Sequence, residues 1–164
     1  MPCALSRLLL LPVAVILHVT CAAQAPQDDP RPARFELHLA QETPDDGLIE
    51  AMVENTDKKV YLFKEVLITN KDLIEVRVIG EGGFFAAEAR GPSYFEIHVV
   101  FTGEGARKMA RASEMHIGKP IAILVDGKVL SAPIVRSVIG DRAAISGSFT
   151  KEVAESLANR IMRK

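Results

Sequence analysis

Hydrophobic and polar residues alternate in short runs through the first half of the chain. In residues 35–40, FELHLA, the large side chains of Phe35, Leu37 and Leu39 alternate with Glu, His and Ala, a pattern typical of a strand buried on one face. TPDDG, at residues 43–47, predicts a turn after this strand. Further β-like runs separated by turn-forming residues predict several more strands rather than one helix: LIEAMV, KVYLFKEVLI, LIEVRVI and GFFAAEAR.

The second half contains two amphipathic helical patterns. After an expected strand at residues 94–101, Thr102 predicts the start of a helix that ends before Gly118. Thr150 predicts the start of a C-terminal helix in the same way, and a helical turn is expected at Thr69 or Asn70. The residues expected on the buried faces are Ala106, Met109, Ala110 and Ile117 in the first helix, and Val153, Leu157 and Ile161 in the second.

Residues 116–135, HIGKPIAILVDGKVLSAPIV, predict a β-hairpin. Asp126-Gly127 separates two apolar runs, and this pair tolerates the positive φ angles of a tight hairpin turn. A strand at residues 142–147 follows. From residue 94 to the C-terminus, the expected order is therefore strand, helix, strand, strand, strand, helix. This order predicts an α+β fold, a ferredoxin-like two-layer sandwich with a mixed, mostly antiparallel sheet and two main helices on one face. A crossover is expected to join the strands at residues 94 and 120 within that sheet.

The N-terminus has the pattern of a signal peptide over residues 1–23. Arg7 precedes an apolar run at residues 8–17 that is shorter than the roughly 20 residues needed to span a bilayer, and small residues follow it. The alternative is lipidation of Cys21, as in a bacterial lipoprotein, although His18 to Thr20 match that signal poorly. We expect an exported chain, periplasmic or secreted in a bacterium, without a transmembrane segment when mature and membrane-anchored only if Cys21 is lipidated.

Composition narrows the function classes further. An apolar content of 48% in 164 residues suits one domain, over residues 35–164, preceded by a disordered linker rich in Pro and Asp at residues 24–34. The net charge of -1 supplies no basic field for nucleic acid. The cysteines are Cys3 and Cys21, so cleavage after residue 23 removes disulfide, thiolate and cysteine–metal chemistry.

The remaining candidate residues do not form a recognisable catalytic or metal site. His38, His98 and His116 lack metal-ligand spacing and are expected to be solvated or to cap a helix. Ser131 with His116 and Asp126 is the one local grouping that suggests a hydrolase, but Asp126 and Ser131 are about 13 Å apart along a strand that rises ~3.3 Å per residue. We therefore expect no catalytic residue, no metal and no cofactor.

Glycine-rich and acidic stretches also favour structural roles. GEGG (residues 80–83) and GEGA (residues 103–106) do not continue into phosphate-binding motifs. The carboxylates of residues 45–46 lie in a predicted turn, and Glu152 and Glu155 lie on a solvated helix face, which argues against a glycosidase.

Residues 94–164 resemble the head of the first periplasmic domain of SecD, the accessory subunit of the bacterial protein-export machinery. FTGEGARKMA is similar to the strand-to-helix signature of this family, HIGKPIAILVDGKVLSAPIV to its long hairpin, and AAISGSFTKEVAESLA to its closing strand and helix. The resemblance is best over residues 60–164. It implies a head that contacts polypeptide, without the family's base and the membrane helices that couple proton flow to export.

We therefore expect a non-enzymatic, exported protein-binding module whose partner is an unfolded polypeptide or a component of the envelope export machinery. A bound peptide is expected to pair with a free sheet edge or to lie against the hairpin tip, Asp126, Gly127 and Lys128. The alternatives are a scaffold domain of the cell envelope and a small hydrolase with an unrecognised site.

Overall fold

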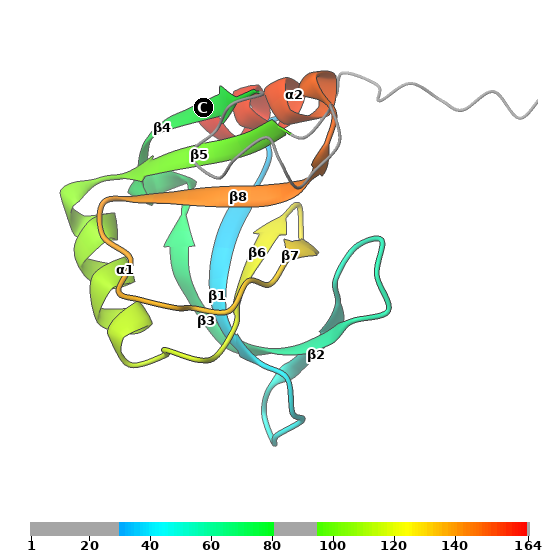
Figure 1. The fold of residues 1–164 in the computed structure, drawn as a ribbon, viewed down its shortest axis with the longest axis vertical. Helices are drawn as coiled ribbons and strands as arrows, with labels where there is room; N and C mark the ends of the chain where they lie inside the picture. The colour runs from blue at the N-terminus through cyan, green and yellow to red at the C-terminus, as the bar shows by residue number, and fades with distance from the viewer. Residues whose placement is uncertain (1–29, 81–94, 164) are drawn as a thin grey trace, which may run out of the picture.

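The computed structural model describes residues 30–80 and 95–163, which form eight strands and two α-helices (Figure 1). In chain order the elements are β1 (Phe35–Gln41), β2 (Ile49–Met52), β3 (Lys59–Thr69), the short 3₁₀ helix η1 (Asn70–Asp72), β4 (Leu73–Ile79), β5 (Phe95–Phe101), α1 (Gly103–Glu114), β6 (Ile121–Val125), β7 (Lys128–Ser131), β8 (Arg142–Phe149) and α2 (Lys151–Met162).

The strands form two sheets, in which all pairs of strands are antiparallel. The five-stranded sheet has the order β2-β3-β1-β6-β7, and the three-stranded sheet has the order β4-β5-β8. Val53 forms an isolated parallel bridge with Val129, and the Glu54 N–H donates to the Val129 carbonyl at 2.8 Å. These contacts bring the two edge strands together, so the five-stranded sheet is curled.

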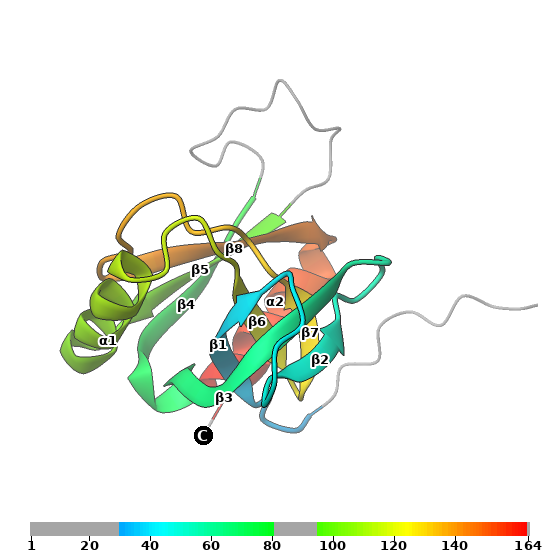
Figure 2. The same cartoon turned by 90° about the horizontal axis from the view of Figure 1, so that it is seen from below.

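One main hydrophobic core joins the two sheets and both helices. The two sheets face each other with α1 at one side (Figure 2). Large buried side chains from β1, β5, α1 and α2 belong to the same cluster, among them Phe35, Phe101, Met109 and Ile161. A smaller cluster, which includes Val60, Leu124 and Val129, fills the curl of the five-stranded sheet.

β6 explains why residues 120–125 are apolar without alternation. Ile121, Ile123 and Val125 belong to the main core, whereas Ala122 and Leu124 belong to the smaller cluster. A strand that is buried on both faces has no solvent-facing positions, so its sequence shows a continuous apolar run.

The α+β class, the antiparallel pairing and the two helices are confirmed, but the expectation of one sheet was wrong. β5 already pairs with β4 on one edge and with β8 on the other. Because a strand has only two edges, β6 pairs instead with β1 and β7. The connection through α1 therefore links the two sheets and is not a crossover within one of them.

The predicted helix starts are confirmed, and the end of α1 differs. Thr102 Oγ1 accepts from the Gly105 N–H at 3.0 Å, and Thr150 Oγ1 accepts from the Val153 N–H at 3.3 Å. α1 ends at Glu114, well before Gly118, which has a φ of +84°. Ile117 consequently lies beyond the helix and is exposed, not buried as the spacing predicted.

The folded domain begins earlier than residue 35. Ala33 is only 3% exposed, and its N–H donates to the Arg160 carbonyl at 3.0 Å, because the end of α2 leaves carbonyl groups without helical partners. Residues 30–34 therefore do not belong to a disordered linker. The predicted signal peptide with Cys21, residues 24–29 and the strand predicted for GFFAAEAR lie outside the described residues. Within residues 30–80 and 95–163, no helix has the length and apolar character needed to cross a membrane.

Candidate functional site

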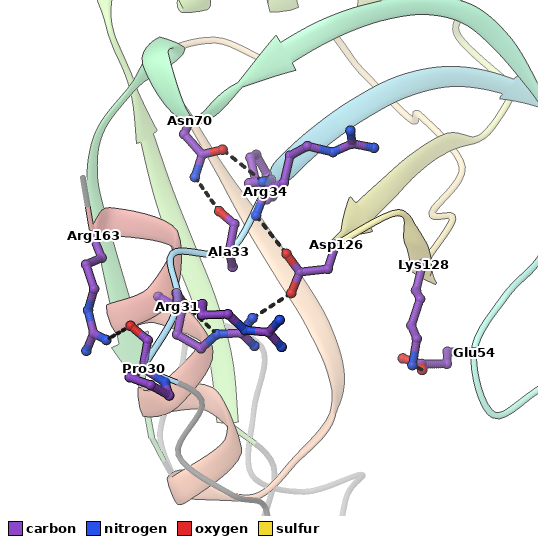
Figure 3. Close-up of polar contacts among 11 residues, drawn as sticks. Pro30, Arg31, Ala33, Arg34, Glu54, Asn70, Asp126, Lys128 and Arg163 are labelled. Carbon is purple, nitrogen blue, oxygen red and sulfur yellow. Dashed lines mark hydrogen bonds and ion pairs between the residues drawn. The ribbon is translucent and has the colours of Figure 1, made fainter.

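The tip of the β6–β7 hairpin is tied to the N-terminal segment. Asp126 and Gly127 have φ angles of +52° and +82°, the backbone geometry of the predicted tight turn. The Asp126 N–H donates to the Arg34 carbonyl, and Asp126 Oδ1 accepts from the Arg34 N–H, both at 2.9 Å (Figure 3). The aspartate thus forms both the turn and a two-way backbone contact.

Charged side chains complete these contacts. Asp126 Oδ2 lies 2.6 Å from Arg160 Nη2 of α2, and Lys128 Nζ lies 3.2 Å from Glu54 Oε1. Asp126, Gly127 and Lys128 are all exposed, so a peptide could still reach the tip. A binding role for the tip stays a prediction, but the contacts made by Asp126 favour a structural role.

Asn70 connects the N-terminal segment with the end of α2. Its Nδ2 group donates to the Ala33 carbonyl at 2.9 Å (Figure 3) and to the Ile161 carbonyl at 2.8 Å. Its Oδ1 accepts from the Phe35 N–H at 2.9 Å. One side chain therefore satisfies three backbone groups, including a carbonyl in the last turn of α2. We call Arg34, Asn70, Asp126 and Arg160 the clasp.

The histidines have structural contacts that differ from the expected ones. His38 and His116 are buried, at 7% and 6% exposure, and are neither solvated nor helix caps. His38 Nδ1 lies 2.9 Å from the Phe63 carbonyl oxygen, and His116 Nε2 lies 2.8 Å from the Ala40 carbonyl oxygen, so each ring nitrogen must donate. Within the described residues no three His, Cys, Asp or Glu side chains gather as metal ligands.

The residues of the hypothetical hydrolase site are engaged in separate places. His116 contacts the end of β1, Asp126 contacts Arg34 and Arg160, and Ser131 is paired with Ile123 in the hairpin. Ser131 Oγ is buried without a hydrogen-bond partner within the part of the chain that the structure describes. These contacts do not form the nucleophile–base–acid relay that a serine hydrolase needs.

A groove between α1 and β3 is the best candidate for a binding site. Its volume is about 690 Å³, within the range of roughly 300–1,000 Å³ that is usual for ligand sites. Apolar side chains from β1, β3 and α1 line it, and charged side chains surround them. The apolar lining residues are Leu39, Phe63, Leu67, Ala112 and Met115, and the charged ones are Lys64, Glu65, Glu104, Arg107, Lys108 and Arg111.

Beside this groove, β3 has an edge without a strand partner. β2 pairs only with Lys59 to Leu62, although β3 continues to Thr69. β1 pairs with β3 on its other edge up to Thr69, with a register shift between Leu62 and Val66. Among the described strands, none covers residues 63–69 on the β2 side. The Thr69 N–H donates to Asp72 Oδ2 at 2.9 Å, so residues 63–68 are the part with which an extended chain could pair.

Contacts with η1 fix α1 next to β3. Lys108 Nζ lies 2.9 Å from Asp72 Oδ1 and 3.2 Å from Glu104 Oε1. Burial acts to raise the pKa of the Asp72 carboxyl, but hydrogen bonds from Lys108 and Thr69 outweigh it and hold this pKa below its ordinary value. The hydrogen bonds to Asp72 and Glu104 in turn raise the pKa of Lys108. This ion pair therefore holds the N-terminal half of α1 at the end of β3.

Gly105 also allows α1 to lie close to η1. A Cβ atom at this position would lie 2.7 Å from the Asp72 carbonyl oxygen, which is too close for any other residue without movement. Sequence reasoning identified residues 103–106 as a helix start, but the spatial reason for the glycine lies in η1.

A second cavity, of about 500 Å³, lies under residues 133–140. Its walls include Phe35, Val99 and Ile145, which belong to the main core. Exposed Arg136 and Arg142 also line it, so the cavity has a core wall and a charged outer wall.

Sequence reasoning missed the groove because its parts are distant along the chain and each has an ordinary local explanation. The available signal was a difference in length: KVYLFKEVLI is much longer than LIEAMV, so a pairing between them leaves part of the longer strand uncovered.

Comparisons with known proteins point to a single family. A family model described as SecDF, P1 head subdomain, matches residues 48–163. The SecD protein translocase subunit of Aquifex aeolicus is 50% identical over 62 residues, which are 38% of this chain and 12% of that protein. The SecD subunit of Elusimicrobium minutum is 37% identical over 98 residues, 60% of this chain and 19% of that protein. The chain thus matches only a small part of these curated relatives.

A solved structure shows the same fold. It is a structure of SecDF, described as a membrane component that enhances protein export, and it aligns with a TM-score of 0.58 at 22% identity. The alignment covers 80% of this chain and 63% of that one.

Proposed function

The chain belongs to the family of SecDF P1 head subdomains, and from this premise we propose that it is a non-enzymatic module of protein export that binds an extended polypeptide segment between α1 and β3. The relatives are subunits of a protein translocase, which makes a polypeptide in transit the natural partner. The chain supplies the contact surface, and the proposal assigns no chemical step to it.

The observation that carries this proposal is the unpaired edge of β3 beside an apolar groove. A peptide added to that edge would gain backbone hydrogen bonds that demand no particular sequence. Alternate side chains of the peptide would point toward Leu67 and Met115 in the groove. Met115 is 74% exposed, and methionine adapts its shape to different partners. Such a site suits a module that must accept many sequences.

The export part of the proposal rests on the sequence pattern of the N-terminus. We propose that residues 1–23 direct the chain across the inner membrane of a bacterium and are removed there. Mass spectrometry of the mature N-terminus tests this. A free amino terminus near Gln24 is expected, and a lipid-modified Cys21 would instead place the domain at the membrane surface.

Backbone methylation of a peptide tests the binding mode directly. The probe is a fluorescently labelled peptide in which valine alternates with serine, measured by anisotropy with the purified protein. Two variants carry N-methyl groups on alternate residues, in opposite phase. Only one phase should lose affinity, by about tenfold or more, because only one set of amides faces β3. Equal affinities for both variants, or no binding of the parent peptide, would contradict strand addition.

A pair of matched substitutions locates the site. Met115→Asp places a charge in the groove, and Ile74→Asp does the same on β4, outside the groove lining; both side chains are exposed, at 74% and 60%. Met115→Asp should weaken binding several-fold while Ile74→Asp should not. If neither substitution changes the affinity, the groove is not the site, and the scaffold function or the hairpin tip becomes the better explanation.

A further inference from the structure

The charged rim of the groove has more cations than anions, and their arrangement is uneven. Lys64, Arg107, Lys108 and Arg111 line the groove together with Glu65 and Glu104. An extended peptide in this groove would lie between the side chains of β3 and those of α1. The charges that remain without partners inside the protein therefore decide which peptide side chains are favoured.

Two of the rim charges are already used within the protein. Lys108 lies between Asp72 and Glu104, at 2.9 Å and 3.2 Å, so this cation and the Glu104 carboxylate neutralise each other. Asp72 adds a second carboxylate to the same ammonium group. This end of the groove offers little free charge to a ligand.

The other rim cations have no carboxylate partner within residues 30–80 and 95–163. Arg107 and Arg111 are exposed and follow each other by one helical turn on α1. Lys64 is exposed on β3, across the groove, and Glu65 next to it is the remaining rim carboxylate. The part of the groove toward the end of α1 is thus basic, although the whole chain has a net charge of -1.

Resting on the proposed function, we propose that the groove selects extended segments in which carboxylate side chains alternate with apolar ones. When a strand pairs with β3, its apolar side chains would face Leu67 and Met115. Side chains of the opposite phase would point toward the rim, within reach of Arg107 and Arg111. Guanidinium groups bind carboxylates in a planar, two-pronged geometry, so arginine suits this task better than lysine.

The expected selectivity is moderate. Exposed ion pairs are individually weak and are screened by salt. Two such pairs together should favour an acidic over a neutral peptide by roughly tenfold at low ionic strength, and most of this preference should vanish in about 1 M salt. The apolar and backbone contribution to the affinity should remain at high salt.

Three peptides of equal length test the proposal with the purified protein: valine alternating with aspartate, with serine and with lysine. The expected order of affinity is aspartate, then serine, then lysine. In the double variant Arg107→Glu with Arg111→Glu the order should reverse, with the lysine peptide binding best. The control, Lys119→Glu with Arg136→Glu, has the same net charge and changes exposed cations outside the groove lining, so it should keep the original order.

The outcomes separate this inference from the function on which it rests. Equal binding of all three peptides would overturn the charge preference and leave polypeptide binding intact. Binding of none would overturn the proposed function itself. A reversal in the control variant as well as in the groove variant would show that net charge, and not the rim, determines the preference, and would also overturn the inference.

Discussion

The clasp and the groove differ in how their polar groups are satisfied. In the clasp, Asn70 and Asp126 bind backbone groups of the N-terminal segment, and Arg160 binds Asp126. In the groove, part of the β3 edge has no strand partner among the described strands, and Arg107 and Arg111 have no carboxylate partner there. The clasp holds the domain together, whereas the groove has backbone groups and charges available to a ligand.

An exposed polar residue can be bound within the protein, or it can be available to a ligand. Asp126 is exposed at a hairpin tip and was a natural candidate for binding, yet both of its carboxylate oxygens have partners within the chain. The groove contains fewer conspicuous residues, but β2 does not extend along β3 beyond Leu62, so that part of the edge has no strand partner among the described strands. A binding surface is thus better located by counting unused backbone and side-chain partners than by exposure alone.

The largest effect on stability is expected at the centre of the clasp. Asn70→Ala removes three hydrogen bonds and leaves the N–H of fully buried Phe35 without its partner, which should cost about 3 kcal/mol of unfolding free energy. Chemical denaturation measures the loss, and the folded variant should bind the valine–serine peptide as the parent does. A loss below about 1 kcal/mol would mean that the clasp contributes little to stability.

A smaller loss is expected at the hairpin tip. Asp126→Ala removes the acceptor of the Arg34 N–H and places alanine at a φ of +52°, which together should cost about 2 kcal/mol. We discount the contact with Arg160 because the Asp126 side chain is 43% exposed. Asp126→Asn is the matched control, since asparagine keeps an acceptor and tolerates this backbone conformation. If this control loses as much stability as the alanine variant, turn geometry is not the reason.

The packing of α1 on η1 should affect both the stability of the domain and the affinity of the groove for a peptide. Gly105→Ala should cost about 1–2 kcal/mol, because the added Cβ meets the Asp72 carbonyl and α1 must move. The affinity for the valine–serine peptide should change as well, since α1 forms one wall of the groove. Gly103→Ala is the control, because its Cβ would meet only the Arg107 guanidinium, at 3.7 Å, and should leave both quantities nearly unchanged. Because alanine is a better helix former than glycine, helix propensity alone would make both variants more stable. A Gly105→Ala variant that is no less stable than Gly103→Ala would therefore contradict the contact with η1.

The smallest effect is expected from the titration of Asp72. Its pKa is lowered in the folded protein, so its contribution to stability is complete above the unfolded value of 3.8 and is lost as the pH falls through the folded value. Unfolding measured from neutral pH down to about pH 2 should show this loss in the parent and not in Asp72→Asn. Parallel pH profiles for the two proteins would contradict the assigned role of the Lys108–Asp72 pair.

Local structure could be predicted from the sequence because it depends on neighbouring residues. The two helix starts, at Thr102 and Thr150, and the Asp126-Gly127 turn follow from hydrogen bonds and backbone preferences within a few residues. The resemblance of residues 94–164 to the SecD head also identified the family correctly.

The tertiary arrangement could not be predicted in the same way. Alternation shows which face of β5 is buried but not which strands take its two edges, so the division into two sheets was missed. The burial of His38 and His116 depends on carbonyl groups of Phe63 and Ala40, which are distant in sequence. The groove has the same origin, since it requires the end of β3 and the side of α1 to meet.

The most direct test of polypeptide binding at the β3 edge is a titration of the isotopically labelled protein with the valine–serine peptide, followed by NMR amide shifts. The largest changes are expected for residues 63–69 of β3 and for α1 from Arg107 to the end of the helix, with little change at Arg34 and Asp126. Changes concentrated at Asp126, Gly127 and Lys128, or along β8, would contradict the proposal and place the polypeptide elsewhere on the domain.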